Sequence, residues 1–181
     1  LGSGLAVMKG NLVYHEEVSR PLDIWARWDS EWYLLIAKEG YAGDNVRAHY
    51  ENLGVSYEPE ATAGFLPLYP LLIRALSPVT GGVGAGILIS NVALGLALVL
   101  LYKLTYSAVA GTGERRRLAG LAACAALLLH PMSLFLSAVY AESLFLALSL
   151  ATWDVARRGR FAAAGIVGAL ATLTRPFGVF L

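Results

Sequence analysis

A stretch of 28 residues without a charged side chain, residues 75–102, constrains the fold of this chain more than any other feature. Lys103 ends the stretch. Because an α-helix rises about 1.5 Å per residue, about 20 residues are enough to cross the hydrocarbon core of a bilayer. The stretch therefore predicts a membrane-spanning helix, and we expect its core at residues 83–102.

The composition also points to a membrane protein. Of the 181 residues, 57% are hydrophobic and 15% are charged, whereas soluble domains carry about 25% charged residues. Residues 1–74 hold 6 Lys and Arg against 10 Asp and Glu, a net −4, and residues 75–181 hold 8 against 3, a net +5. The basic residues interrupt apolar runs and form no solvated patch, which argues against nucleic-acid binding.

Further spans are expected in the second half of the chain. Residues 118–156 are too long for one span, so they predict a hairpin whose turn is at residues 130–133, where Pro131 cannot continue a helix. Residues 161–181 begin another span. We expect a division into residues 1–64, which hold the end of a first span and a long outer loop, and residues 65–181, with about four spans or re-entrant segments. Since the chain starts without Met and stops inside an apolar run, we expect a piece of a longer protein.

Two arginine-rich segments predict the orientation in the membrane. Residues 111–117 and 157–160 are interpreted as polar loops, each carrying three arginines. Because Lys and Arg are enriched in cytoplasmic loops, both segments should face the cytoplasm, and the two spans between them agree with that. The turn at 130–133 and the acidic N-terminal segment then lie on the outer, extracytoplasmic or luminal, side.

Within the outer loop, residues 21–37 are predicted to form an amphipathic helix. Trp25, Trp28, Trp32 and Ile36 recur at intervals of three and four residues and would share one apolar face. Tryptophans on one face are typical of a helix at the membrane–water boundary. A helix that only anchors the loop is the simplest interpretation.

Asp29 lies beside these tryptophans and is a candidate general base. A carboxylate partly shielded by aromatic rings can take a proton from a hydroxyl, although a solvated interfacial acid is the alternative interpretation. Glu31 is a weaker candidate because it projects to another helix face. His130 is typical of a turn residue that caps a helix end.

Glu142 is the single formal charge between residues 118 and 153. We expect it inside the second span of the hairpin, where a carboxylate is costly and marks a functional site. The alternative is a packing hydrogen bond through Ser143 or Tyr140.

Arg175 is expected in the outer half of its span, at the depth of Glu142. Its planar guanidinium suits a phosphate, and Pro176 can break the helix so that backbone groups line a cavity. A structural Arg175–Glu142 ion pair is the alternative. Together, Asp29, Glu142 and Arg175 would converge on one side of the membrane, which suits a lipid-phosphate substrate.

Residues 65–70 contain two prolines and are expected to follow an irregular path back toward the membrane. The glycines at residues 81–86 follow no strand and precede no lysine, so they do not predict a phosphate-binding loop.

Four segments of the chain resemble motifs of one known family. Residues 28–41 resemble WDxxWYxxIAxxGY, residues 65–70 resemble FFPLYP, residues 137–145 resemble SAxYTESLF, and residues 174–178 resemble TRPxG. These motifs are typical of mannosyltransferases related to the GPI second mannosyltransferase (PIG-V-like). The resemblance covers residues 25–181, with Ala141 in place of the usual Thr.

The resemblance implies an all-α, polytopic transmembrane helical bundle of the glycosyltransferase C (GT-C) type. Such enzymes transfer sugar from a polyprenyl-phosphate-linked donor and keep an essential acid in the first outer loop, a position that Asp29 matches. By analogy, Asp29 would deprotonate the acceptor hydroxyl, which would displace the phosphate with inversion at the anomeric carbon. Arg175 would stabilise the departing lipid phosphate.

The substrate site is expected to involve seven residues besides the membrane lipids around it: Asp29 as the catalytic residue, and Glu142, Arg175, Tyr140, Trp28, Trp32 and Tyr33 as substrate-binding residues. The donor would be a polyprenyl-phosphate mannose, and the acceptor a lipid, glycan or protein. No metal or cofactor is expected. A non-catalytic membrane protein, such as a lipid-glycan transporter or an inactive glycosyltransferase-like subunit, is the alternative.

Overall fold

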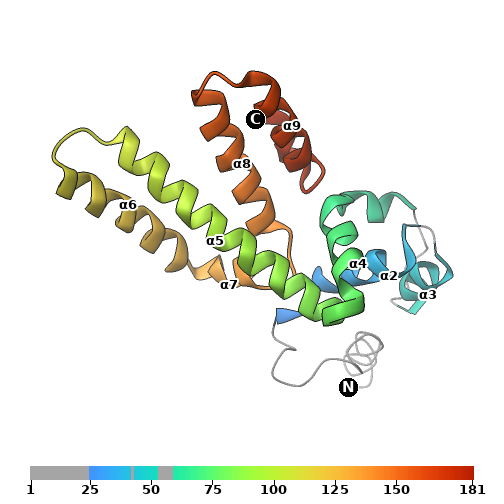
Figure 1. Ribbon diagram of the computed structural model, residues 1–181. Coiled ribbons are helices and arrows are strands. Elements are labelled where there is room, and N and C mark those ends of the chain that lie inside the picture. Colours follow the sequence, from blue (N-terminus) through green and yellow to red (C-terminus); the bar gives the residue numbers. More distant parts are fainter. Residues whose placement is uncertain (1–24, 42, 53–58) are drawn as a thin grey trace.

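The computed structural model describes residues 25–41, 43–52 and 59–181, and every regular element in these residues is a helix (Figure 1). The α-helices and the short 3₁₀ helices (η) follow in the order α2 (Ser30–Glu39), α3 (Asp44–Asn52), η3 (Pro59–Gly64), α4 (Leu68–Thr80), α5 (Gly82–Ala108), α6 (Gly113–Leu128), η4 (Pro131–Ser133), α7 (Leu134–Ser137), α8 (Glu142–Arg157), α9 (Phe161–Thr172) and η5 (Pro176–Phe180). The prediction of an all-α fold is confirmed for this part of the chain.

Helix α5 is the long axis of the structure. It has 27 residues and is long and apolar enough to cross a membrane, the one single helix in the described residues that is. Helix α6 and the η4–α7 segment pass the same criterion together, but they are bent by 74°. Helix α5 starts at Gly82 because Gly81, with a φ of +72°, ends α4 and donates its N–H to the Ser77 carbonyl. The helix expected over residues 83–102 is therefore present.

The other helices pack around α5. Helices α4, α6 and α8 all contact it, and α9 packs on α8. Alanines make the α5–α8 contact close, since Ala93, Ala97 and Ala147 form one buried cluster. In Figure 1, α2, α3 and α4 gather at one end of α5, and the α5–α6 connection is at the other end. The candidate outer residues and the arginine-rich segment thus lie at opposite ends of one long helix.

The connection between the two helices of the predicted hairpin over residues 118–156 is longer than expected. Helix α6 ends at Leu128 and α8 begins at Glu142, with only η4 and the four-residue α7 between them. Residues 138–141 stay outside a helix because their backbone finds tertiary partners: Val139 donates its N–H to the Trp25 carbonyl (2.9 Å), and the Tyr140 carbonyl accepts from the Ser90 hydroxyl (3.0 Å). Glu142 does not lie within a helix that continues through residues 138–141, because it is the first residue of α8.

Two smaller expectations also need correction. The three arginines of residues 111–117 do not lie in a loop, because α6 starts at Gly113 with Thr112 as its N-cap; the Thr112 hydroxyl accepts from the Arg115 N–H (3.4 Å). The irregular path over residues 65–70 ends early, because α4 starts at Leu68. Pro70 lies in the first turn of α4, where backbone N–H groups have no partner within the helix. The missing N–H of Pro70 therefore costs no helical hydrogen bond.

Gly86 is where α5 approaches the non-helical segment most closely. A Cβ at Gly86 would lie 2.5 Å from Val139 Cγ1, whereas a Cβ at Gly95 of the same helix would meet nothing within 4 Å. We expect Gly86→Ala to lower the free energy of unfolding by about 1–2 kcal/mol through overpacking. Gly95→Ala should raise it by up to about 1 kcal/mol through helix propensity. Thermal unfolding of the full-length protein in detergent measures both, and equal effects of the two substitutions would contradict the close packing.

Candidate functional site

The candidate residues come from three segments that are distant in sequence. Residues 25–29 precede α2, residues 137–142 lead into α8, and residues 173–176 follow α9. Backbone hydrogen bonds hold the segments together: Val139 donates to the Trp25 carbonyl (2.9 Å), and Leu68 at the start of α4 donates to the Leu173 carbonyl (2.9 Å). The three segments therefore meet at the end of α5 where α2 and α4 lie.

The helix expected over residues 21–37 is not continuous. Residues 21–24 lie outside the described part, and α2 begins only at Ser30. Trp28 has a φ of +56°, the left-handed region that a large L-residue avoids at a cost of about 1–2 kcal/mol. Tyr140 compensates for this backbone, because its hydroxyl donates to the Arg27 carbonyl (3.1 Å) and accepts from the Asp29 N–H (3.2 Å).

The tryptophans consequently do not share one face. Trp25 donates its indole N–H to the Ser137 hydroxyl (3.3 Å). Trp28 is 64% exposed and lies against Phe135, with ring centroids 6.0 Å apart, and Trp32 stacks on Phe65 at 5.9 Å. The predicted aromatic stripe is therefore wrong, and each tryptophan joins the 25–32 segment to a different neighbour.

Asp29 presents an exposed carboxylate at the start of α2. It occupies the N-cap position, but its side chain accepts no capping hydrogen bond. Glu31, the weaker candidate, is 7% exposed and lies in the core. Asp29 is thus held by its backbone while its carboxylate takes no part in capping the helix.

Glu142 and Arg175 form an ion pair. Arg175 Nη1 donates to Glu142 Oε1 at 2.5 Å, and the side chains are 37% and 25% exposed for Arg175 and Glu142. The other oxygen, Glu142 Oε2, is buried and has no hydrogen-bond partner among the residues that the structure describes. As expected, the helix breaks at Pro176: α9 ends at Thr172, and Arg175 has an extended backbone. The ion pair that the sequence left as an alternative is present.

Buried tyrosines connect Asp29 to the ion pair. The Tyr33 ring makes edge-on contacts with Phe65 (5.2 Å), Tyr69 (5.0 Å) and Tyr140 (6.4 Å) between centroids. Burial raises the pKa of Tyr33, the Glu142 charge raises it further, and the Arg175 charge opposes that rise.

Tyr140 shows the same effect. Burial and the nearby Asp29 charge raise the pKa of Tyr140 to about 12. The hydroxyls of Tyr33 and Tyr140 therefore remain protonated at neutral pH and can donate hydrogen bonds. Since both respond to the charges of Asp29 and Glu142, these four groups and Arg175 belong to one electrostatic neighbourhood.

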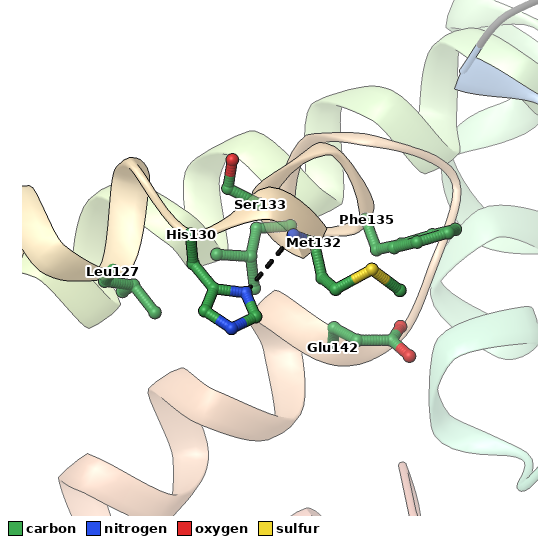
Figure 2. Close-up of a pocket in the computed structure, with 7 residues that line it drawn as sticks. Leu127, His130, Met132, Ser133, Phe135 and Glu142 are labelled. Carbon is green, nitrogen blue, oxygen red and sulfur yellow. Dashed lines mark hydrogen bonds between the residues drawn. The ribbon is translucent and has the colours of Figure 1, made fainter.

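An apolar cavity of about 270 Å³ adjoins this neighbourhood (Figure 2). Its lining residues are Leu127, His130, Met132, Ser133, Phe135, Leu136 and Glu142. In Figure 2 the Glu142 side chain lies next to Met132 and Phe135. His130 Nδ1 accepts from the Met132 N–H (3.2 Å), which confirms its predicted capping role. The arrangement offers an apolar space with one carboxylate and a neighbouring guanidinium, features that suit an amphipathic, anionic ligand.

Comparison with known proteins decides the family. The sequence model described as Mannosyltransferase (PIG-V) matches residues 10–180. The chain belongs to the PIG-V mannosyltransferase family. It is 31% identical over 166 residues to the GPI alpha-1,6-mannosyltransferase 2 of Mus musculus and 32% identical over 165 residues to that of Cricetulus griseus. Each alignment covers 85% of this chain and 29% of the relative, so the chain spans less than a third of these proteins. No solved structure matches the chain.

Several residues around the site of this PIG-V family member were not singled out from the sequence. Phe65 and Tyr69 pack on Tyr33, and Phe135 packs on Tyr140 with centroids 4.8 Å apart. Phe65 and Tyr69 lie in the segment that resembles FFPLYP, so this motif could have identified them as candidate site residues. Apart from His130, which the sequence marks as a turn residue, the cavity lining between residues 127 and 136 carries no pattern that could have identified it.

The described residues of this PIG-V chain include no group of three His, Cys, Asp or Glu side chains that could hold a metal ion. The candidate site brings together the charged groups Asp29, Glu142 and Arg175, with the Tyr33 and Tyr140 hydroxyls as neutral donors.

Proposed function

We propose that this protein is an integral membrane mannosyltransferase that moves mannose from a polyprenyl-phosphate donor to a hydroxyl of a lipid or glycan acceptor, with inversion. The observation that supports this most is the exposed Asp29 carboxylate in the same electrostatic neighbourhood as the Glu142–Arg175 pair, whose Glu142 lines an apolar cavity. The relatives named GPI alpha-1,6-mannosyltransferase 2 support mannose as the sugar that moves.

Asp29 acts as the general base in this proposal. The acceptor oxygen gives its proton to the Asp29 carboxylate and forms a bond to the anomeric carbon. The bond from that carbon to the phosphate oxygen breaks on the opposite face, and the lipid phosphate leaves with the electron pair. Tyr140 positions Asp29, because its hydroxyl accepts from the Asp29 N–H and fixes the backbone on both sides of Trp28.

Arg175 binds the phosphate in this proposal. A guanidinium has five N–H donors, and Glu142 takes one of them at Nη1, so the remaining donors can bind phosphate oxygens while the ion pair fixes the orientation. The cavity beside Glu142 receives the first part of the lipid chain, since its lining is apolar apart from Glu142, His130 and Ser133. Trp28, Trp32 and the Tyr33 hydroxyl border the sugar and the acceptor.

The membrane arrangement belongs to the same proposal. Helix α5 spans the bilayer, α6–α7, α8 and α9 complete a polytopic GT-C bundle, and the Asp29 end faces the outer side. The segment that holds Asp29 and the arginines of α6 lie at opposite ends of α5, and this supports the proposed orientation.

A comparison of two labelled sugar donors tests the proposal. Membranes containing the full-length protein are supplied with radiolabelled polyprenyl-phosphate mannose or with radiolabelled GDP-mannose under conditions that block lipid-donor synthesis. We expect transfer from the lipid donor alone, with the product's anomeric configuration opposite to the donor's. Direct transfer from GDP-mannose, retention of configuration, or translocation of a lipid-linked glycan without transfer would each contradict it, the last in favour of a transporter.

A further inference from the structure

A second cavity is lined by residues from the end of α5 and the start of α6. Figure 1 shows that this α5–α6 connection lies at the end of α5 opposite α2–α4. It has a volume of about 440 Å³ and is lined by Tyr102, Lys103 and Tyr106 of α5 and by Gly113 and Arg117 of α6. Each helix therefore contributes one cation, and α5 adds two aromatic rings.

Glycines on α6 let the two helices close around this cavity. A Cβ at Gly120 would lie 2.6 Å from Tyr102 Cδ2, so the Tyr102 ring packs directly on the α6 backbone. The Tyr106 hydroxyl lies 3.9 Å from where a Cβ at Gly113 would be. The two tyrosine rings are stacked, with centroids 6.1 Å apart. The cavity thus has an aromatic wall fixed by close helix packing.

Neither cation at the cavity forms an ion pair with a described residue, although Glu114 lies in the first turn of α6. Lys103 and Arg117 are exposed, and neither has a carboxylate within ion-pair distance among the described residues. Arg115 and Arg116 precede Arg117 on the first turns of α6 and add to the positive potential. Two unpaired cations from different helices at one cavity favour an anionic ligand, and a phosphate in particular.

The depth of the cavity in the bilayer identifies the source of that phosphate. Residues 82–102 of α5 are free of charge, and at about 1.5 Å per residue they span roughly 31 Å, close to the thickness of the hydrocarbon core. The inference rests here on the proposed membrane arrangement: with α5 across the bilayer and Lys103 directly after the charge-free residues, the cavity lies at the level of the lipid headgroups. Tyrosines are enriched at this level, and basic pockets between spanning helices on the cytoplasmic side bind anionic headgroups.

We propose that this cavity binds the phosphate of an anionic phospholipid headgroup. Lys103 and Arg117 contact the phosphate oxygens from α5 and α6, and the wall formed by Tyr102 and Tyr106 packs against the glycerol part of the lipid. The ligand joins the ends of α5 and α6 and is independent of the sugar donor, which is placed at the opposite end of α5.

Binding to the purified full-length protein in neutral detergent tests this site. The probes are dioctanoyl phosphatidic acid, dioctanoyl phosphatidylcholine and inorganic phosphate, and the variants are Lys103→Gln/Arg117→Gln, the charge-conserving Lys103→Arg/Arg117→Lys, and the matched control Arg158→Gln/Arg160→Gln. We expect phosphatidic acid to bind more tightly than the other probes. The Lys103→Gln/Arg117→Gln variant should lose roughly 30-fold in affinity for it, whereas the charge-conserving variant and the control should stay within about threefold.

Any of the following results would overturn the proposal. Equal affinity for phosphatidic acid and phosphatidylcholine would exclude an electrostatic headgroup site, and equal affinity for inorganic phosphate would identify a free-phosphate site. An equal loss in the control would mean that net charge alone attracts the lipid. Thermal unfolding and donor-transfer activity, measured for each variant, separate a folding defect from lost lipid binding. A misfolded variant would also lose the donor-transfer activity.

Discussion

Replacing Asp29 with asparagine is expected to lower mannosyl transfer by roughly a hundredfold to ten-thousandfold, the range that a general base contributes. The size of asparagine is close to that of aspartate, and the Asp29 side chain makes no capping hydrogen bond that the change could remove. The backbone contact that positions residue 29, from its N–H to the Tyr140 hydroxyl, is retained. The loss should therefore appear in kcat for transfer from polyprenyl-phosphate mannose, with the thermal unfolding midpoint unchanged.

Asp44 provides the matched control for this substitution. It is an exposed aspartate in the first turn of α3, in the same N-terminal region as Asp29. Asp44→Asn removes the same charge and should leave transfer within about twofold, apart from a stability loss of a few tenths of a kcal/mol from the helix dipole. Full activity of Asp29→Asn in a folded protein would show that another group takes the proton, and a similar loss in both variants would indicate a general charge effect.

Features that depend on local composition were predictable from the sequence. The charge-free stretch at residues 75–102 predicts the α5 span, and Pro131 and Pro176 mark the places where helices end. Arg175 and Glu142 could be paired from sequence because each is an isolated charge in an apolar stretch, and such charges need a partner. Only the choice between an ion pair and a phosphate ligand stayed open.

The start of α2 could not be predicted, because its cause lies more than a hundred residues away. The tryptophan spacing favours one continuous helix, yet the Tyr140 hydroxyl holds Arg27 and Asp29 on either side of a left-handed Trp28. Similarly, nothing local shows that residues 138–141 stay outside a helix, since the Trp25 carbonyl and the Ser90 hydroxyl supply their hydrogen bonds. Hydrophobic periodicity indicates which helix faces are apolar, but it contains no information about hydrogen bonds between distant segments.

Arg175→Ala is expected to raise the KM for the lipid donor by roughly tenfold to a hundredfold, the value of a charge-assisted hydrogen bond to phosphate. The substitution should also lower the free energy of unfolding, by about 1–3 kcal/mol, because it leaves the mostly buried Glu142 carboxylate without its partner. Arg175→Lys keeps the charge and loses the planar fork, so its KM should fall between those of the wild type and the alanine variant.

An exchange of charges separates the two roles of Arg175. The double variant Glu142→Arg/Arg175→Glu keeps two opposite charges at the same two positions, so it should retain the thermal stability of the wild type if the pair contributes to it. Donor binding should remain weak, because a carboxylate at position 175 repels the phosphate, and Glu142→Gln alone should change KM only severalfold. Recovery of transfer in the exchanged variant would contradict phosphate binding by Arg175. The pair would then serve only to join the start of α8 to the segment after α9, and the phosphate would need another cation.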